Sequence, residues 1–424
     1  MTRIVIAYFA TKLHGESYYN NLYEIFKKHV SKTGIVVEAT QPITSVEEAR
    51  SLGEKYRDYF PVLISLTGGT SKLMYEFAKA TGSPRVLLIG HGDHNSLPST
   101  ISARSRLDSD GVYTWIEHCK RPESPECGSI VEKTLIIAKT VSSLLGSKIL
   151  LIAEREEKPD EAEELEALLG GVVDVVSMDT IASKLGEADT ALVESFYKSL
   201  EIYEFTIPKD SLEYVARFYA IVKSMALNNG YKGIAVDCFP YLVKYRITPC
   251  LALAVLNAEG IVTACEGDLG SLLLMMIYKE LTGLTGWIAN ASVFRGNKIY
   301  FSHCTIATNM ILSGKIVTHF ESGYPYALSG RLVPSTYTLT SISRDYSIIM
   351  GGVGKITTSG LLYNTMCRTQ AIVELDYDVE ELPLYLPANH HVLVPGDIRR
   401  ELKAVAWLLG IDYVDYSEIA GCKK

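Results

Sequence analysis

The spacing of apolar residues changes near Trp287, and this change constrains the fold more than any other feature. Before Trp287, short apolar runs alternate with segments in which apolar residues recur every three or four positions. That pattern is typical of strand–helix–strand units and a mainly parallel sheet. After Trp287, apolar and polar residues alternate in runs such as KIYFSHCT and QAIVELD, separated by Gly and Pro. This period of two predicts an antiparallel sheet or a small barrel.

The segments before Trp287 predict two successive α/β layers. In the first layer, strands are expected at 3–9, 35–39, 61–66 and 85–89, and helices at 18–30, 46–59, 72–80 and 129–145. In the second layer, strands are expected at 148–153, 172–177, 233–236 and 261–264, and helices at 211–228, 248–257 and 269–281. Because 424 residues exceed what one hydrophobic core usually supports, we expect several domains.

We therefore predict an α/β protein with two Rossmann-like α/β layers followed by a C-terminal antiparallel β-barrel. The predicted domains are an N-terminal α/β domain at 1–146, a second α/β domain at 147–286 and the barrel with a terminal helix at 287–424. The period changes at the second of these boundaries, and no repeat or low-complexity linker marks either one.

The charge balance excludes several classes of partner. Lys and Arg number 41 against 49 Asp and Glu, a net charge of -8, and no local basic patch is present. Such a chain repels nucleic acid and anionic membranes. The densest apolar stretch, 269–278, is too short to span a bilayer, and the N-terminus has no signal-peptide pattern. The eight cysteines include no CxxC pair, so we expect reduced thiols in a cytoplasmic protein.

The segment IVTACEGDLG contains the most informative acidic residue, and it falls in the second predicted domain. Glu266 lies just past a predicted strand and just before a predicted helix, and ligands of α/β sheets bind at the carboxyl ends of strands. Asp268 directly precedes the helix, which favours a capping role for it. Glu266 has no such local role and is the better functional candidate.

Asp237 repeats the placement of Glu266 at the end of the strand 233–236. An Asp at a strand end is also a common turn former, so a role in a site and a role in a turn remain equally open. In either case the two acids share one edge of the predicted sheet.

Three histidines in the predicted barrel are candidate metal ligands. His303 lies on a strand, and His390 and His391 are neighbours on another, so only one of that pair can face a given site. Carboxylate and imidazole ligands together favour Mn, Fe, Co or Zn. The alternative for His303 is a packed core histidine, and this spacing alone does not decide between the two.

A third polar cluster follows the strand 85–89 in the first layer. His91, His94 and Asn95 lie in the loop HGDHNSL, and a nearby LTGGTS segment precedes a helix. The loop can contact a ligand, or it can be a polar loop that caps the next helix. The glycine-rich segment can hold an anion at the helix N-terminus, but it lacks the spacings of nucleotide-binding motifs.

Five separated motifs carry a resemblance to a known family. CEGDLGSLL, FSHCT, HFESG, CRTQ and NHHVLVPGD occur in this order. Together they resemble the second domain and C-terminal barrel of the L-fucose isomerase and L-arabinose isomerase superfamily, above all the shorter fucose isomerase-like proteins. The resemblance covers about 233–410. In the N-terminal region it is weaker and rests on the segment FAT at 9–11 and on the HGDHNSL loop.

The resemblance implies a divalent metal, commonly Mn, that holds two sugar oxygens. Glu266 matches the first metal carboxylate of the family, and His303 matches the histidine of its SH pair. The C-terminal metal histidine matches His390 or His391. We assign His391 as the metal ligand and His390 as a substrate contact.

Asn290, in the segment WIANAS, departs from the family pattern. The family has a second acidic ligand and acid/base there, and an amide can bind a metal through oxygen but cannot take a proton. Glu266 must then work with a different proton-transferring base, for which Asp237 and Asp268 are the candidates. Arg368, in the CRTQ motif, is expected either to contact a substrate anion or to form a structural salt bridge.

The function implied by the resemblance is metal-dependent conversion of an aldose into its ketose by proton transfer between C1 and C2. The alternative is a sugar-binding or regulatory protein that keeps the fold without catalysis. The expected partner is a small-molecule sugar. The resemblance also implies a homo-oligomer, with a hexamer favoured, in which the loop containing His91, His94 and Asn95 contacts the sugar in a neighbouring subunit.

Overall fold

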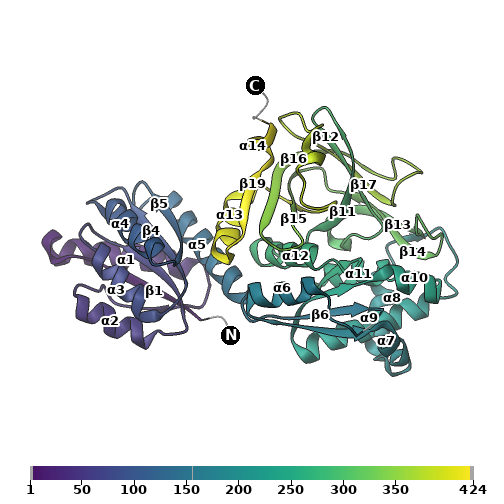
Figure 1. Cartoon of the computed structure of the whole chain (residues 1–424), viewed down its shortest axis with the longest axis horizontal. Helices are drawn as coiled ribbons and strands as arrows, with labels where there is room; N and C mark the ends of the chain where they lie inside the picture. Colours follow the sequence, from purple (N-terminus) through teal and green to yellow (C-terminus); the bar gives the residue numbers. More distant parts are fainter. Residues whose placement is uncertain (1–2, 155, 421–424) are drawn as a thin grey trace. The chain divides into compact units, whose positions relative to one another are not determined.

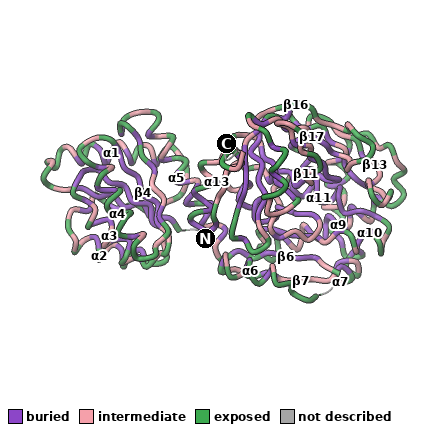
Figure 2. Tube along the Cα trace, turned by 45° about the horizontal axis from the view of Figure 1, so that its top comes forward, coloured by how far each residue is buried: buried purple, intermediate pink, exposed green. Residues whose placement is uncertain are grey.

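The computed structural model describes residues 3–154 and 156–420, whose contacts divide the chain into two units. Unit 1 comprises residues up to Ser143 together with Arg400–Gly410, and unit 2 comprises the rest. In each unit the buried residues follow the central strands, as Figure 2 shows. The second and third predicted domains share one core in unit 2, because residues of the parallel sheet and of the barrel pack in the same hydrophobic cluster.

Unit 1 is a parallel sheet covered by helices (Figure 1). Its strand order is β2-β1-β3-β4-β5, with bounds β1 Ile4–Phe9, β2 Glu38–Ala39, β3 Phe60–Ser65, β4 Arg85–His91 and β5 Tyr113–Cys119. The helices are α1 Glu16–Lys32, α2 Val46–Lys55, α3 Ser71–Thr81, α4 Ser96–Ser109, α5 Pro125–Leu144 and, from the C-terminal region, α13 Arg399–Leu409. The sequence patterns missed α4 and β5, because α4 is rich in Ser and β5 buries only part of its side chains.

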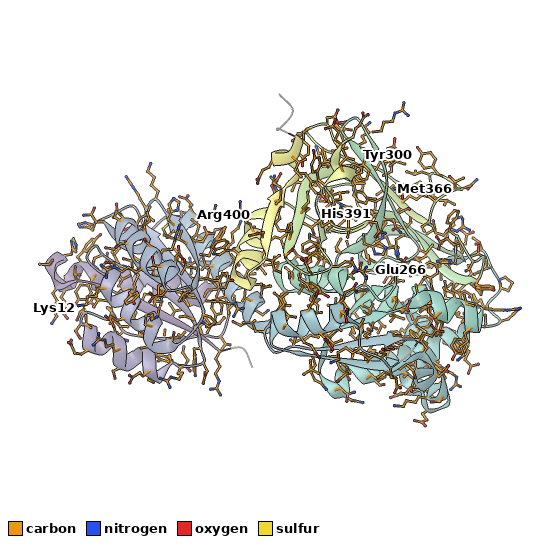
Figure 3. The ribbon with its side chains drawn as sticks, in the orientation of Figure 1. Lys12, Glu266, Tyr300, Met366, His391 and Arg400 are labelled. Carbon is orange, nitrogen blue, oxygen red and sulfur yellow. A yellow bond between two sulfur atoms is a disulfide. The ribbon has the colours of Figure 1, made fainter. Side chains whose placement is uncertain are left out.

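Helix α13 is anchored in unit 1 by an ion pair. The guanidinium of Arg400, which Figure 3 labels, donates to the carboxylate of Glu117, with 2.6 Å between Nη2 and Oε2. The carboxylate of Glu117 is buried and also accepts a hydrogen bond from Nε1 of Trp115. A buried carboxylate needs such partners, because leaving it unpaired is costly.

A disulfide joins Cys119 to Cys127 in unit 1. The expectation of reduced thiols is wrong for this pair: β5 ends at Cys119, and α5 brings Cys127 back with 5.0 Å between the Cα atoms. Cys422 lies outside the described residues. The remaining cysteines are free thiols of unit 2.

Unit 2 begins with a second parallel sheet, of order β10-β9-β6-β7. Its strands are β6 Lys148–Ala153, β7 Val172–Ser177, β9 Tyr231–Val236 and β10 Val262–Cys265. Its helices are α6 Asp160–Leu169, α7 Met178–Ser183, α8 Thr190–Ser199, α9 Leu212–Asn229, α10 Cys238–Tyr245, α11 Cys250–Ala258 and α12 Leu269–Thr282. Helices α11 and α12 bury most of their side chains, because α12 packs against both the parallel sheet and the barrel, and α11 packs against β10 and α9.

Unit 2 also contains a closed antiparallel barrel, ordered β15-β18-β11-β12-β17-β16 and closed by β15–β16 pairing. Its strands are β11 Trp287–Arg295, β12 Lys298–His303, β15 Thr336–Ile342, β16 Ile348–Gly360, β17 Thr369–Glu374 and β18 His390–Pro395. Beside it lies a small sheet of β8 Glu204–Phe205, β13 Ile311–Thr318 and β14 Pro325–Leu332. The predicted fold class, two α/β layers followed by a barrel, is confirmed.

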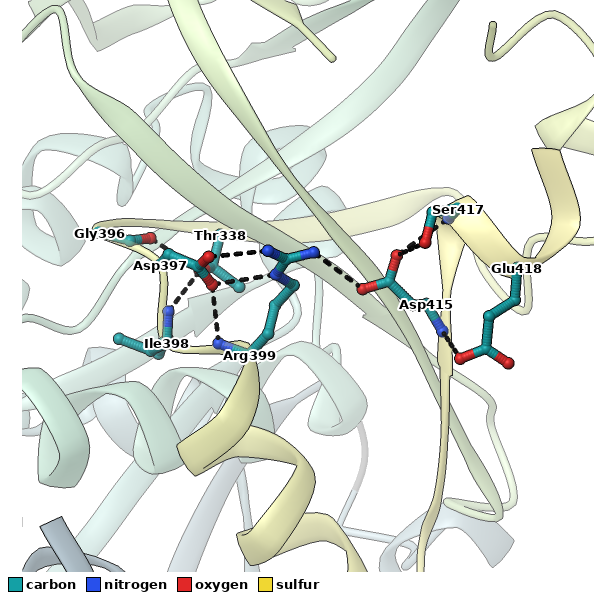
Figure 4. Close-up of polar contacts among 8 residues, drawn as sticks. All are labelled: Thr338, Gly396, Asp397, Ile398, Arg399, Asp415, Ser417 and Glu418. Atoms are coloured by element: carbon teal, nitrogen blue, oxygen red, sulfur yellow. Dashed lines mark hydrogen bonds and ion pairs between the residues drawn. The ribbon is translucent and has the colours of Figure 1, made fainter. Parts of the chain in front are cut away.

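Strand β19 (Asp412–Asp415) extends the barrel sheet beside β16, and helix α14 (Tyr416–Ala420) follows it. Arg399 fastens β19 to the end of β18: its guanidinium donates to Asp397 and, at 3.3 Å, to Oδ2 of Asp415 (Figure 4). Asp415 in turn accepts hydrogen bonds from Ser417. Among the described residues, no helix is both long and apolar enough to cross a membrane.

Candidate metal centre

Glu266 occupies a strained turn between β10 and α12. Its φ is 59° and that of Gly267 is 65°, so two successive residues are left-handed. Only Gly adopts this conformation freely, and a non-Gly residue there costs on the order of 1–3 kcal/mol. The turn is held by a 2.9 Å hydrogen bond from the Gly267 N–H to the Val236 carbonyl. Strain at one acidic residue of a sheet edge is a feature typical of functional sites.

Two barrel histidines face the Glu266 carboxylate. His303 ends β12, with its Nε2 3.4 Å from Oε1, and His390 begins β18, with its Nε2 3.5 Å from Oε2. One ligand atom from each of the three residues lies within 4.8 Å of the others. Figure 3 shows Glu266 between the helices of the parallel sheet and the barrel, so both halves of unit 2 contribute to this cluster.

The chemistry of this cluster fits a metal ion. The His303 and His390 side chains are only 3% and 7% exposed, yet both ring nitrogens of His303 and the Nε2 of His390 lack a hydrogen-bond partner. Buried polar atoms without partners are rare and costly. A cation bound by the two imidazoles and the carboxylate would give a partner to Nε2 of His390 and to one ring nitrogen of His303, and this ligand set suits divalent transition metals. The structure therefore confirms that the cluster can hold a metal, without identifying it.

Asp268 has two roles beside the cluster. Its Oδ1 accepts the Ser271 N–H at 2.7 Å and caps α12, as predicted. Its Oδ2 lies 2.8 Å from Nδ1 of His390. A carboxylate on one ring nitrogen of a histidine fixes the ring and leaves the other nitrogen for a metal.

His390 and the two carboxylates beside it favour each other's ionised forms. For Glu266, burial raises the pKa, but the neighbouring imidazoles of His303 and His390 outweigh burial and the pKa is lowered. For Asp268, burial also raises the pKa, and the contact with His390 outweighs it. For His390, burial lowers the pKa, but Asp268 and then Glu266 raise it above the ordinary value. Both carboxylates are therefore anionic at neutral pH.

His391 points away from this cluster. It is completely buried, with its Nε2 2.6 Å from the Tyr416 hydroxyl, and burial lowers its pKa to about 4. Neighbouring residues of a strand face opposite sides, so His390 and His391 cannot both face Glu266. The geometry corrects our assignment: His390 is the candidate ligand, and His391 is a packed, neutral histidine.

Asn290 and Arg368 have partners within the protein. Oδ1 of Asn290 accepts a 2.8 Å hydrogen bond from Asn389, and a metal role for this amide stays a prediction. Arg368 donates from Nε to the Thr318 carbonyl at 2.8 Å, and its guanidinium lies 5.6 Å from the Phe320 ring centre. These contacts favour a structural role for Arg368 over a substrate contact.

Glu266 borders two cavities that share part of their lining. One, of about 890 Å³, includes Asp237, and the other, of about 330 Å³, includes Asp268 and His390. These volumes are typical of small-molecule sites. Burial, then the charges of Glu154 and Glu266, raise the pKa of Asp237, which lies between β9 and α10. The structure thus brings both predicted strand-end acids to one cavity.

The predicted N-terminal loop lies in unit 1, after β4. His91 is completely buried, and its Nε2 forms a 3.1 Å hydrogen bond with the Leu66 carbonyl. The ring therefore links the end of β4 to the segment after β3 and is not free to contact a sugar. His94 and Asn95 have φ of 47° and 58°, and the His94 ring lies 4.2 Å from that of Tyr18. A contact of His94 or Asn95 with a sugar stays a prediction.

Neither a scan against protein-family models nor a search of curated proteins finds a match to this chain. The assignment to an isomerase family therefore stays a prediction. The metal centre rests on the geometry of the described residues.

Proposed function

We propose that the protein is a metal-dependent aldose–ketose isomerase of the cytoplasm, acting on a sugar or sugar derivative. The observation that carries this proposal is the Glu266, His303 and His390 cluster, with unpartnered buried nitrogens, at the edge of two cavities. The five motifs that resemble the L-fucose and L-arabinose isomerases support the reaction class.

Glu266, His303 and His390 would hold a divalent ion, for which the resemblance supports Mn. When bound, such an ion polarises the oxygens of a sugar and so acidifies the neighbouring C–H bond. Asp268 keeps His390 oriented, because its Oδ2 holds the Nδ1 side of the ring.

Asp237 is the proposed base for the C–H proton. It lines the same cavity as Glu266, and its raised pKa makes its carboxylate a better proton acceptor than an exposed Asp. In the proposed reaction its carboxylate oxygen takes the proton from C2 of an open-chain aldose, exchanges it with solvent and delivers a solvent-derived proton to C1. The proton on O2 moves to O1, so that the C1 carbonyl is lost as the C2 carbonyl forms. This role also accounts for Asn290, whose neutral amide cannot move a proton.

The charge of the larger cavity favours a neutral sugar over a phosphorylated or sulfonated one. Its acidic lining is Glu154, Glu157, Asp160, Glu161, Glu164, Asp237, Glu266 and Asp345. The two cations of the lining are already paired, Lys158 with Glu166 and Arg344 with Glu161. An anionic substrate would meet repulsion that a single dication only partly offsets.

The test is to load the purified protein with Mn²⁺, supply a panel of neutral aldoses and their phosphates in D2O, and follow the products by NMR. We expect a ketose from at least one neutral aldose, with deuterium at C1, and slower conversion of its phosphate. Absence of ketose from every aldose, together with sugar binding by calorimetry, would instead support the alternative of a sugar-binding or regulatory protein. The missing second acid at Asn290 is the observation that favours that alternative.

A homo-oligomer, with a hexamer favoured, belongs to the same proposal and rests on the resemblance alone. In such an assembly the loop with His94 and Asn95 would reach the sugar of a neighbouring subunit. Light scattering tests it, and an active monomer would refute the shared site.

A further inference from the structure

The free cysteines of unit 2 gather behind the metal centre. Cys265 directly precedes Glu266, and Cys304 directly follows His303. The sulfur of Cys265 lies 3.2 Å from that of Cys238, and its thiol also contacts that of Cys250. These thiols come from separate elements of the parallel layer and the barrel, so the fold alone assembles them.

Cys250 and Cys304 continue this row toward the surface. They pack with Ala327 in one small core, and Cys367 packs against the same core. Among the described residues, every free cysteine therefore contacts another one.

Exposure differs sharply along the row. The inner four, Cys238, Cys250, Cys265 and Cys304, are each at most 2% exposed, whereas Cys367 is only partly buried. Cys367 lines a cavity of about 750 Å³ together with Phe320 and Met366. A small solute in this cavity meets the Cys367 residue, which packs against the core that contains Cys304.

We propose that Cys304 and Cys367 are an oxidative modification site, which a hydroperoxide entering this cavity converts into a reversible disulfide. One sulfur of the pair attacks an oxygen of hydrogen peroxide, the O–O bond breaks, and a sulfenic acid and water form. The other sulfur then attacks the sulfenic sulfur, the S–O bond breaks, and the disulfide and a second water form. Two thiols lose two electrons and two protons, and hydrogen peroxide is reduced to two waters.

The crosslink would tie the end of β12 to the loop before β17, one residue from the candidate ligand His303. It does not depend on the proposed isomerase activity. The inner Cys238–Cys265 pair provides the contrast: its sulfurs are close, but both are buried, so we expect it to stay reduced.

Peptide mapping tests the site in the full-length protein. Tryptic cleavage after Lys and Arg places Cys304 and Cys367 in separate peptides, 299–315 and 356–368, each with one cysteine. After treatment with hydrogen peroxide and alkylation of the remaining thiols, we expect these peptides crosslinked in most chains and separated again by a dithiol reductant.

Two variants sharpen the test. Cys367→Ser should abolish the crosslink, and Cys238→Ser, a matched change in the inner pair, should leave it intact. Full alkylation of Cys304 and Cys367 after peroxide would overturn the proposal, and so would oxidation of the inner pair ahead of them. Peptide mapping of the wild-type protein tests the proposed disulfide even if a variant fails to fold.

Discussion

Nδ1 of His390 lies 2.8 Å from Oδ2 of Asp268, and this contact determines which ring nitrogen faces Glu266. The same carboxylate caps α12, so the position of the histidine is coupled to the start of a buried helix. Asp268 thereby fixes the start of α12 and the start of β18 relative to each other at the candidate metal site.

Replacing Asp268 by Asn separates its two roles. Asn caps helices about as well as Asp, so the thermal unfolding midpoint should change little. The lost charge no longer holds the Nδ1 proton of His390, and metal affinity should fall by about 10- to 100-fold. A chelator-competition titration measures this. Unchanged affinity would mean that Asp268 is only a cap.

The stability of the metal-free protein should depend on pH through this pair. The pKa of His390 is raised, so its contribution is fully present below about pH 6.5 and is lost as the pH rises through its folded pKa. The pKa of Asp268 is lowered, so its contribution is present above about pH 3.9 and is lost as the pH falls through its folded pKa.

The pair should therefore contribute most in mildly acidic solution, by about 1–3 kcal/mol. The measurement is urea unfolding of wild type and Asp268→Asn, both metal-free, across this range. A stability difference that stays constant from mildly acidic to alkaline pH would contradict the linkage.

Asp237→Asn tests the proposed base. The amide keeps the shape of the side chain but cannot take a proton, so turnover should fall by about 10²- to 10⁴-fold. Metal content should not change, because Asp237 is not a ligand. Glu154→Gln is a matched control from the same cavity lining, and it should reduce turnover far less. Equal losses in both variants would assign the effect to cavity charge.

Asn290→Asp restores a carboxylate where the resembling family has one. Asn290 pairs with His390 across β11 and β18, so the new charge lies beside a candidate ligand. The Asp oxygen can still accept the hydrogen bond from Asn389. We expect metal binding to tighten by about tenfold or more, as measured by calorimetry. Unchanged metal affinity would show that the site does not use an acidic residue at position 290.

The sequence predicted the parts of the site that depend on a single element. Glu266 follows an apolar strand and precedes a clear helix, so its place at the sheet edge can be inferred from the local pattern of residues. The choice between His390 and His391 cannot, because it depends on where β18 starts to pair with β11. The Asp268–His390 contact is also hidden in the sequence, since it joins residues 122 positions apart.

The cysteines show the same limit. The disulfide of Cys119 and Cys127 depends on how α5 returns along β5, and neither residue belongs to a recognisable motif. The row of thiols behind the metal centre arises only when the parallel layer and the barrel pack together. Local periodicity predicts single helices and strands, but contacts between distant elements are seen only in the folded structure.

Metal analysis of neighbouring histidine variants tests the central claim most directly. The wild-type protein, dialysed against a divalent transition metal and then against buffer, should retain about one ion per chain by mass spectrometry of the metal. His390→Ala should lose that ion, whereas His391→Asn and Tyr416→Phe, which alter only the packed histidine and its partner, should keep it. Retention of the ion by His390→Ala, or its loss in the His391 variant with the fold intact, would contradict the site described.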